Sequence, residues 1–195
     1  MKEAIIMRIL MLGNSFTYFH DMPQILSHLL GCEVVAHTRG GAYLAEQFNP
    51  ETEMGAKTLK ALQEEKWDYV VLQEQSNAPA LKREAFLRSA KALCDLIHQN
   101  GAKPLFYASW AYREGSEMLT STGLTFDEMH NALYDSYHAA AEAGNALVAD
   151  VGVAFRAVRE QADVYENDDY HPSAAGSVLA ACVIARTIDA DRAAK

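Results

Sequence analysis

The sequence predicts an α/β fold in which a parallel sheet of about five strands lies between two layers of helices. Short apolar runs alternate with longer amphipathic stretches over almost the whole chain. The runs are largely apolar rather than alternating, which is typical of parallel strands covered on both faces. Because such strands are joined by right-handed crossovers, we expect a three-layer α/β/α sandwich. There is no internal repeat, linker or low-complexity segment, so we expect residues 1–195 to form one domain.

Each strand and helix is predicted from a segment of characteristic length and pattern. In the segment 82–100, Phe86, Leu93 and Ile97 recur at helical spacing, and Gly101 supplies the stop signal. The segment 111–125 is rich in Ser, Thr and Gly, and is either a binding loop or lid or a flexible insertion. Strands are expected at Ile6–Leu12, Glu33–Thr38, Tyr69–Leu72, Pro104–Ala108 and Ala146–Ala149, and helices at Met22–Leu30, Glu51–Glu65, Lys82–Asn100, Phe126–Ala143 and Ser173–Ile188.

Composition and charge exclude several classes of function. The chain has 195 residues and a formal net charge of −9, which disfavours binding to nucleic acid or to an anionic membrane surface. Cys32, Cys94 and Cys182 form no CxxC pair, so neither a zinc site nor a disulfide framework is indicated. The first residues are a poor signal peptide, and no apolar run approaches the roughly 18 residues of a membrane span. We therefore expect a cytoplasmic protein; the sequence does not determine its oligomeric state.

Four polar or glycine-rich segments follow strands or precede the last helix, where ligands bind in such folds. The first, "GNSFT", places Ser15 directly after the first strand. In one interpretation Ser15 or Thr17 only caps the next helix. In the other, Ser15 is a nucleophile at the edge of the sheet. The segment is not the G-x-S-x-G elbow of α/β-hydrolases, because Thr17 stands where that motif has its second glycine.

A second segment, "DDYHPSAAG", supplies an acid and a base within one turn of chain. Asp168 and His171 are three residues apart, so the carboxylate can accept the Nδ1 hydrogen and leave Nε2 free to take a proton from a serine. Pro172 keeps His171 extended, and Ser173 can cap the final helix. The alternative is a solvated acidic turn with a surface histidine.

Together these segments resemble the SGNH hydrolases, also called GDSL-like esterases. The resemblance covers "GNSFT" (13–17), "RGGAYL" (39–44), "LQEQS" (72–76) and "DDYHPSAAG" (168–176), in the order of the family. It implies the three-layer α/β/α fold, Ser15 as nucleophile, His171 as base and Asp168 as its acid partner. The first block departs mildly, because Asn14 stands where the family motif has aspartate.

The resemblance also implies an oxyanion hole. The family's second-block glycine donates a backbone N–H, a role that falls to Gly41, with Gly40 as the alternative register. The Ser15 N–H is a further donor. The third block usually carries Gly-x-Asn-Asp, but here no asparagine is in register. Gln75 offers the same amide donors on a longer stem, and Asn77 and Gln73 are its rivals.

Other residues have weaker claims to a role. His20 follows Ser15 closely, and Trp110 and Tyr112 follow the fourth strand, so these side chains, with Asn14 and Asn77, are candidates to line the substrate pocket. Trp110 and Tyr112 are explained equally well by core packing. Asp168, Asp169 and His171 could instead bind a divalent cation, but no second cluster offers further ligands, so we expect no metal.

The sequence-based hypothesis is a cofactor-free serine hydrolase that cleaves an ester of a small molecule, such as an O-acetyl group on a carbohydrate. The first alternative is a non-catalytic protein of the same fold that binds a sugar or acyl ligand. A nucleotide-binding domain is a weaker alternative, because neither G-x-G-x-x-G nor a P-loop is present. Acyl chain length and the alcohol portion of the substrate are not encoded in a readable motif.

Overall fold

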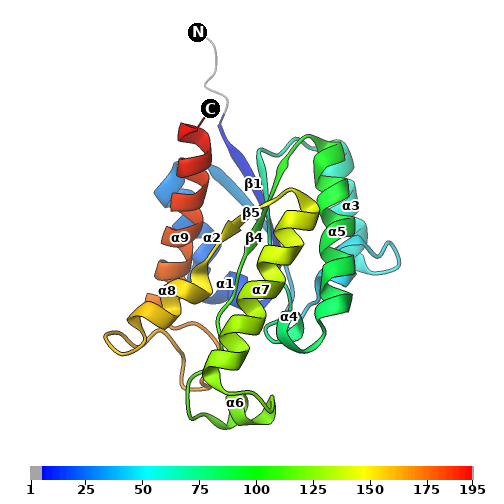
Figure 1. Ribbon diagram of the computed structural model, residues 1–195. Coiled ribbons are helices and arrows are strands. Elements are labelled where there is room, and N and C mark those ends of the chain that lie inside the picture. Colours follow the sequence, from blue (N-terminus) through cyan, green and yellow to red (C-terminus); the bar gives the residue numbers. More distant parts are fainter. Residues whose placement is uncertain (1–5, 195) are drawn as a thin grey trace.

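The sheet of the computed structural model, which describes residues 6–194, has five parallel strands in the order β2-β1-β3-β4-β5 (Figure 1). Helices cover both of its faces, so the predicted three-layer α/β/α fold is confirmed. The direction in which strands are added to the sheet reverses between β1 and β3. Ligands bind in the crevice at such a switch point in folds of this type. The strands are β1 (Arg8–Gly13), β2 (Glu33–Thr38), β3 (Tyr69–Leu72), β4 (Lys103–Tyr107) and β5 (Leu147–Ala149).

The strand predictions are accurate for β2 and β3 and shifted by one or two residues for the others. The first strand was expected from Ile6, but β1 begins at Arg8. The register explains the difference, because Arg8 pairs with Glu33, the first residue of β2, and Ile6 has no strand residue opposite it. Ile6 is instead 62% exposed.

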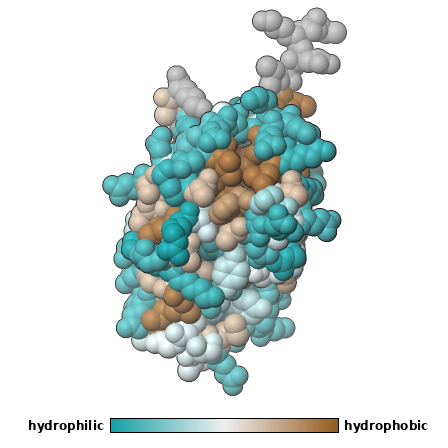
Figure 2. All heavy atoms as spheres, turned by 90° about the vertical axis from the view of Figure 1, so that its right-hand side faces the viewer, coloured by the Kyte–Doolittle hydropathy of each residue, from teal (hydrophilic) through white to brown (hydrophobic). Residues whose placement is uncertain are grey.

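Two groups of helices sandwich the sheet (Figure 1). On one face lie α2 (Met22–Leu30), α8 (Val151–Val158) and α9 (Ala174–Ala193). On the other lie α3 (Glu53–Glu64), α5 (Arg83–Asn100) and α7 (Phe126–Gly144). Figure 2 shows many hydrophilic side chains on the side on which α3 and α5 lie, as expected of amphipathic helices that bury one face, around a hydrophobic patch in the upper part of the view.

The helix ends follow from local sequence chemistry. Helix α5 stops at Gly101, whose φ of +90° is a left-handed conformation that glycine adopts without strain. Helix α7 starts with a capping box between Thr125 and Glu128. Ser173 caps α9 by accepting the backbone N–H of Gly176 at 3.1 Å, as predicted.

Several short helices were not predicted. Helix α8 was missed because eight residues carry too little periodicity to separate it from a loop, yet its Phe155 stacks on Trp110 at a centroid distance of 3.9 Å. The segment 111–125 contains α6 (Glu117–Ser121) and is therefore partly helical. The remaining short elements are α1 (Ser15–Tyr18), α4 (Ala78–Leu81) and the 3₁₀ turns η1 (Phe19–Asp21) and η2 (Leu44–Phe48).

No helix within residues 6–194 combines the length and the apolar character needed to cross a membrane.

Candidate active site

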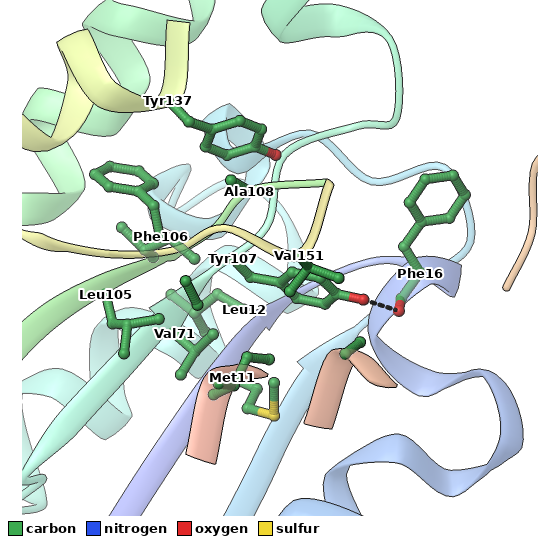
Figure 3. Close-up of a cluster of buried hydrophobic side chains, with 14 of the residues drawn as sticks. Met11, Leu12, Phe16, Val71, Leu105, Phe106, Tyr107, Ala108, Tyr137 and Val151 are labelled. Atoms are coloured by element: carbon green, nitrogen blue, oxygen red, sulfur yellow. Dashed lines mark hydrogen bonds between the residues drawn. The ribbon is translucent and has the colours of Figure 1, made fainter. Parts of the chain in front are cut away.

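Ser15 is the first residue of α1 and follows the end of β1 by two positions. Asn14 caps this helix, because its Oδ1 accepts the Phe16 N–H at 3.2 Å. From β4, the buried Tyr107 hydroxyl donates to the Phe16 carbonyl at 3.1 Å and supports the turn from the core (Figure 3). The capping role expected of Ser15 or Thr17 thus belongs to Asn14. The Ser15 hydroxyl is left to point elsewhere.

That hydroxyl faces His171. The distance from Ser15 Oγ to His171 Nε2 is 2.8 Å, and His171 Nδ1 lies 2.7 Å from Asp168 Oδ2. Asp168 Oδ1 accepts the backbone N–H groups of His171 at 3.0 Å and Tyr170 at 3.2 Å. Burial opposes ionisation of Asp168, but these donated hydrogen bonds outweigh it and hold the pKa of the carboxyl below its ordinary value. Asp168, His171 and Ser15 therefore form one continuous hydrogen-bonded chain.

The neighbouring Asp169 points to a different partner. Its backbone is left-handed, with a φ of +70°, and its Oδ1 lies 2.8 Å from Nε of Arg113. The backbone N–H of Arg113 also donates to the Asp169 carbonyl at 2.8 Å. The guanidinium further donates to Asp163 Oδ1 at 2.8 Å. Asp168 alone of the two aspartates reaches the imidazole.

Aromatic rings surround the imidazole of His171. The ring of Phe19 stacks nearly parallel to it at a centroid distance of 4.3 Å, and Tyr170 lies at 4.1 Å with a tilt of 39°. Phe19 precedes two residues in the left-handed region, His20 and Asp21, with φ values of 51° and 53°. His20 Nε2 bonds to Glu166 Oε1 at 2.8 Å, which ties this turn to the loop that carries Asp168 and His171.

A cavity of about 410 Å³ opens beside the serine. Gln75 and Gly41, two of the predicted oxyanion donors, line it together with Ser15 and His171. The backbone φ of Gly41 is +69°, which favours glycine. The complete lining is Asn14, Ser15, Phe16, Tyr18, Phe19, Gly40, Gly41, Gln75, Ser76, Tyr170 and His171. A larger cavity, of about 750 Å³, lies among residues at the starts of β3, β4 and β5. None of the residues that line the cavity beside Ser15 lines this larger one.

Four of the candidates for pocket lining are placed elsewhere. Trp110 is fully buried and stacks on Phe16 at 4.5 Å, so it belongs to the core behind Ser15. Tyr112 is also buried, although its hydroxyl lies 2.7 Å from Oγ of the lining residue Ser76. His20 is exposed and paired with Glu166, as described above. Asn77 precedes the first residue of α4, makes no capping hydrogen bond with its side chain and does not line the cavity.

The geometry separates the three rivals for the side-chain oxyanion donor. Gln73 is buried, and its Oε1 accepts the Asn14 N–H at 3.1 Å and the Thr17 hydroxyl at 2.9 Å. Its Nε2 donates to the carbonyl of Glu74. Gln75 lines the cavity, and its Nε2 donates one hydrogen bond, to Ser76 Oγ at 3.2 Å. Because an amide nitrogen carries two hydrogens, Gln75 keeps one for a ligand. Of the three, Gln75 alone lines the cavity.

Sequence reasoning missed three residues that hold this site in place, Phe19, Glu74 and Arg113. Each acts through a contact between segments distant in sequence, so no local motif marks them. The one available signal was at Glu74, a carboxylate two residues after the end of the fully buried strand β3, where a charged side chain is unusual.

Comparisons with known proteins add to this geometry. The chain matches no protein-family model and no curated protein sequence. Among solved structures, it is 45% identical to a protein from Slackia heliotrinireducens provisionally assigned to the SGNH hydrolases, with a TM-score of 0.90. That match covers 94% of this chain and 99% of the other.

More distant structures share the fold. An arginine-to-alanine variant of an acetyl-xylooligosaccharide esterase from Geobacillus stearothermophilus is 18% identical, with a TM-score of 0.67 and 96% of each chain covered. Two further structures of that enzyme are described as catalytic mutants, in which a serine or a histidine is replaced by alanine. The 45% identity over nearly the full length of both chains decides the assignment, and this chain belongs to the SGNH hydrolase family.

Proposed function

We propose that the protein is an esterase that uses Ser15 as nucleophile, His171 as general base and Asp168 as the carboxylate that orients the histidine. The observation that carries the proposal is the hydrogen-bonded chain from Ser15 Oγ to His171 Nε2 at 2.8 Å and from His171 Nδ1 to Asp168 Oδ2 at 2.7 Å. Both distances fall in the range of a working nucleophile, base and acid.

In the proposed reaction, Ser15 Oγ attacks the ester carbonyl while its proton passes to His171 Nε2. The ionised Asp168 stabilises the imidazolium that forms. Collapse of the tetrahedral intermediate breaks the bond to the alcohol oxygen, which leaves with the proton from His171. Water then attacks the acyl-Ser15 ester, again with His171 as base, and releases the carboxylic acid.

The proposed oxyanion hole consists of the backbone N–H groups of Ser15 and Gly41 and the side-chain amide of Gln75. Gln75 and Gly41 come from loops after different strands and both line the cavity beside Ser15. Loss of one such donor typically lowers turnover about a hundredfold or more. We therefore expect Gln75→Ala to lower kcat far more than it raises KM, whereas Asn77→Ala leaves both unchanged.

The proposed substrate carries a short acyl group, such as an O-acetyl group on a carbohydrate. Aromatic rings at the cavity, those of Tyr18, Phe19 and Tyr170, can contact the flat face of a sugar ring. Tyr18 is 40% exposed and therefore available to a ligand. The acetyl-xylooligosaccharide esterase described above, which has the same fold, acts on an ester of this class.

Two measurements on matched proteins test the proposal. A fluorophosphonate should label the wild-type protein and leave Ser15→Ala unlabelled, because only an activated serine reacts. Hydrolysis of p-nitrophenyl esters from acetate to palmitate should be fastest for acetate and absent in Ser15→Ala. A folded wild-type protein that is neither labelled nor active would instead support a non-catalytic protein that binds a sugar or acyl ligand.

A further inference from the structure

We propose that Glu74 is a positioning residue that holds the two loops of the oxyanion hole at a fixed separation, an inference that rests on the proposed function. Glu74 directly precedes Gln75 and is 2% exposed. It does not line the cavity, so its carboxylate acts through its neighbours rather than on substrate.

One carboxylate oxygen joins the two loops. Glu74 Oε1 accepts the backbone N–H of Gln75 at 2.7 Å and the backbone N–H of Leu44 at 3.0 Å. Leu44 is the first residue of η2 and follows the loop after β2 that contains Gly41, and Gln75 belongs to the loop after β3. Because both donors converge on the same atom, a shift of that oxygen changes the position of both loops.

The backbone of Glu74 is tied to the loop of the nucleophile as well. Asn14 Nδ2 donates to the Glu74 carbonyl at 3.2 Å and to the Ala42 carbonyl at 3.1 Å. The amide of Gln73, which accepts the Asn14 N–H, also donates to the Glu74 carbonyl. Three loops, after β1, β2 and β3, therefore meet in one buried hydrogen-bonded cluster of Asn14, Gln73 and Glu74.

Stability alone does not account for a carboxylate at this position. Among the residues that the structure describes, no ion pair involves Glu74, and an unpaired buried charge is costly. Burial raises the pKa of the Glu74 carboxyl, although the N–H groups of Gln75 and Leu44 oppose that shift. What the side chain provides is an acceptor of the right length between two backbone donors. An amide oxygen at the same place would provide it too.

Glu74→Asp and Glu74→Gln separate this role from a general need for the residue. Aspartate keeps the charge but retracts the oxygen by one methylene, whereas glutamine keeps the oxygen in place and removes the charge. We expect Glu74→Asp to lower kcat for p-nitrophenyl acetate about tenfold to a hundredfold with KM within about twofold, since small displacements of catalytic groups have effects of this order. Glu74→Gln should retain kcat within about threefold.

Asn100→Ala is the matched control for a merely structural role. Asn100 is also buried, and its Nδ2 donates to two backbone carbonyls, those of Leu62 and Glu65, each at 2.7 Å. It ends α5 next to the start of β4, at the edge of the sheet opposite Ser15. We expect Asn100→Ala to lower the melting temperature but to leave kcat unchanged.

A double-mutant cycle provides a second measurement that is independent of how well one variant folds. If Glu74 acts through the Gln75 amide, Glu74→Asp should lower kcat much less in the Gln75→Ala background than in the wild type. Equal effects in both backgrounds, wild-type kcat in Glu74→Asp, or a loss in Glu74→Gln as large as in Glu74→Asp would each overturn the inference. An active wild type with such a result refutes this inference alone, whereas an unlabelled and inactive wild type refutes the proposed function as well.

Discussion

The two sides of the candidate site are held in different ways. On the nucleophile side, Asn14, Gln73 and Glu74 are each at most 2% exposed and bond mainly to backbone groups. On the acid–base side, the side chain of Asp168 is 42% exposed. The loop around it is fixed at the surface by the ion pair of Arg113 with Asp169 and by the hydrogen bond of His20 with Glu166.

Because of this difference, the nucleophile side should be held in place more strongly than the acid–base side. Buried hydrogen bonds act in a medium of low dielectric. They are costly to break, because the donor or acceptor that remains has no water molecule to bond to. Exposed ion pairs contribute about 0–1 kcal/mol each and are screened by salt. The nucleophile side should therefore be rigid and insensitive to salt, and the loop on the acid–base side should be the part that solution conditions can loosen.

The largest effect is expected at the acid itself. Asp168→Asn should lower kcat about a thousandfold, because the amide no longer stabilises the imidazolium and can favour the wrong tautomer of His171. Asp169→Asn is the control; asparagine tolerates its left-handed backbone, and we expect activity within about threefold of wild type. Ester hydrolysis by the purified variants measures both, and a larger defect at Asp169 would contradict the assignment of Asp168.

The next effect concerns how acid changes the stability around β2, the strand that pairs with β1. His37, near the end of β2, is buried, and burial lowers its pKa from 6.5 to about 4. Its Nδ1 lies 3.0 Å from Thr58 Oγ1, which donates to Gln47 Oε1, so the neutral ring must donate through Nδ1. The unfolded chain binds a proton below pH 6.5 that the folded chain does not, so stability is present above pH 6.5 and is lost as pH falls toward 4.

The size of this loss follows from the pKa difference. A shift from 6.5 to about 4 corresponds to about 3 kcal/mol of unfolding free energy between those pH values. Denaturant unfolding at a series of pH values gives the unfolding free energy as a function of pH. Over this range the unfolding free energy should vary less with pH for His37→Asn than for the wild type, whatever the stability of the variant at pH 7. Parallel curves for the two proteins would show that His37 does not cause the loss.

A third prediction tests the departure of Asn14 from the aspartate of the family motif. Asn14 Nδ2 donates to the carbonyls of Ala42 and Glu74, so aspartate would place an acceptor against two acceptors. We expect Asn14→Asp to lower the free energy of unfolding by about 2 kcal/mol. In the control Asn49→Asp, the exposed side chain needs only its Oδ1 acceptor for the Glu51 N–H, and stability should not change. Equal stability of Asn14→Asp and wild type would show that the amide donors are dispensable.

What the sequence could predict depends on how local the determining contacts are. Asp168 and His171 share one turn of chain, and Ser15 lies two positions after an apolar strand, so spacing and pattern are sufficient to find them. The same is true of long helices such as α5, where buried residues recur with a helical period. Helix α8 was not predicted, because a segment of eight residues is too short to show a clear helical period.

The misplaced residues depend on packing between distant segments. Trp110 and Tyr112 follow a strand at the edge where ligands bind, and only the stacking of Trp110 between Phe16 and Phe155 places it in the core. Likewise, the choice of Gln75 over Gln73 depends on a bond between Gln73 and the backbone of Asn14, 59 residues earlier in the chain. A sequence pattern gives the identity of these side chains but not their contacts with residues far away in the chain.

The smallest expected effect is the one that tests the surface clamp of the acid–base loop. Arg113 pairs with Asp169 and Asp163 and holds the turn that carries Asp168 and His171. Its partners are 37% and 70% exposed, so the clamp should contribute less than about 1 kcal/mol. We expect Arg113→Gln to lower kcat/KM about threefold at low salt, with a melting temperature close to that of the wild type.

Salt should mimic this substitution. Raising NaCl from about 0.05 M to about 0.5 M shortens the screening length severalfold, so wild-type activity should fall toward that of Arg113→Gln while the variant barely responds. The matched control is Arg156→Gln, which removes an exposed ion pair between α8 and α7, Arg156 with Asp127 at 2.8 Å. That variant should keep both the wild-type activity and its salt response. If Arg113→Gln remains as salt-sensitive as the wild type, the ion pairs of Arg113 do not hold the acid–base loop, and the contrast between the two sides must have another origin, such as the aromatic packing of Phe19 and Tyr170 around His171.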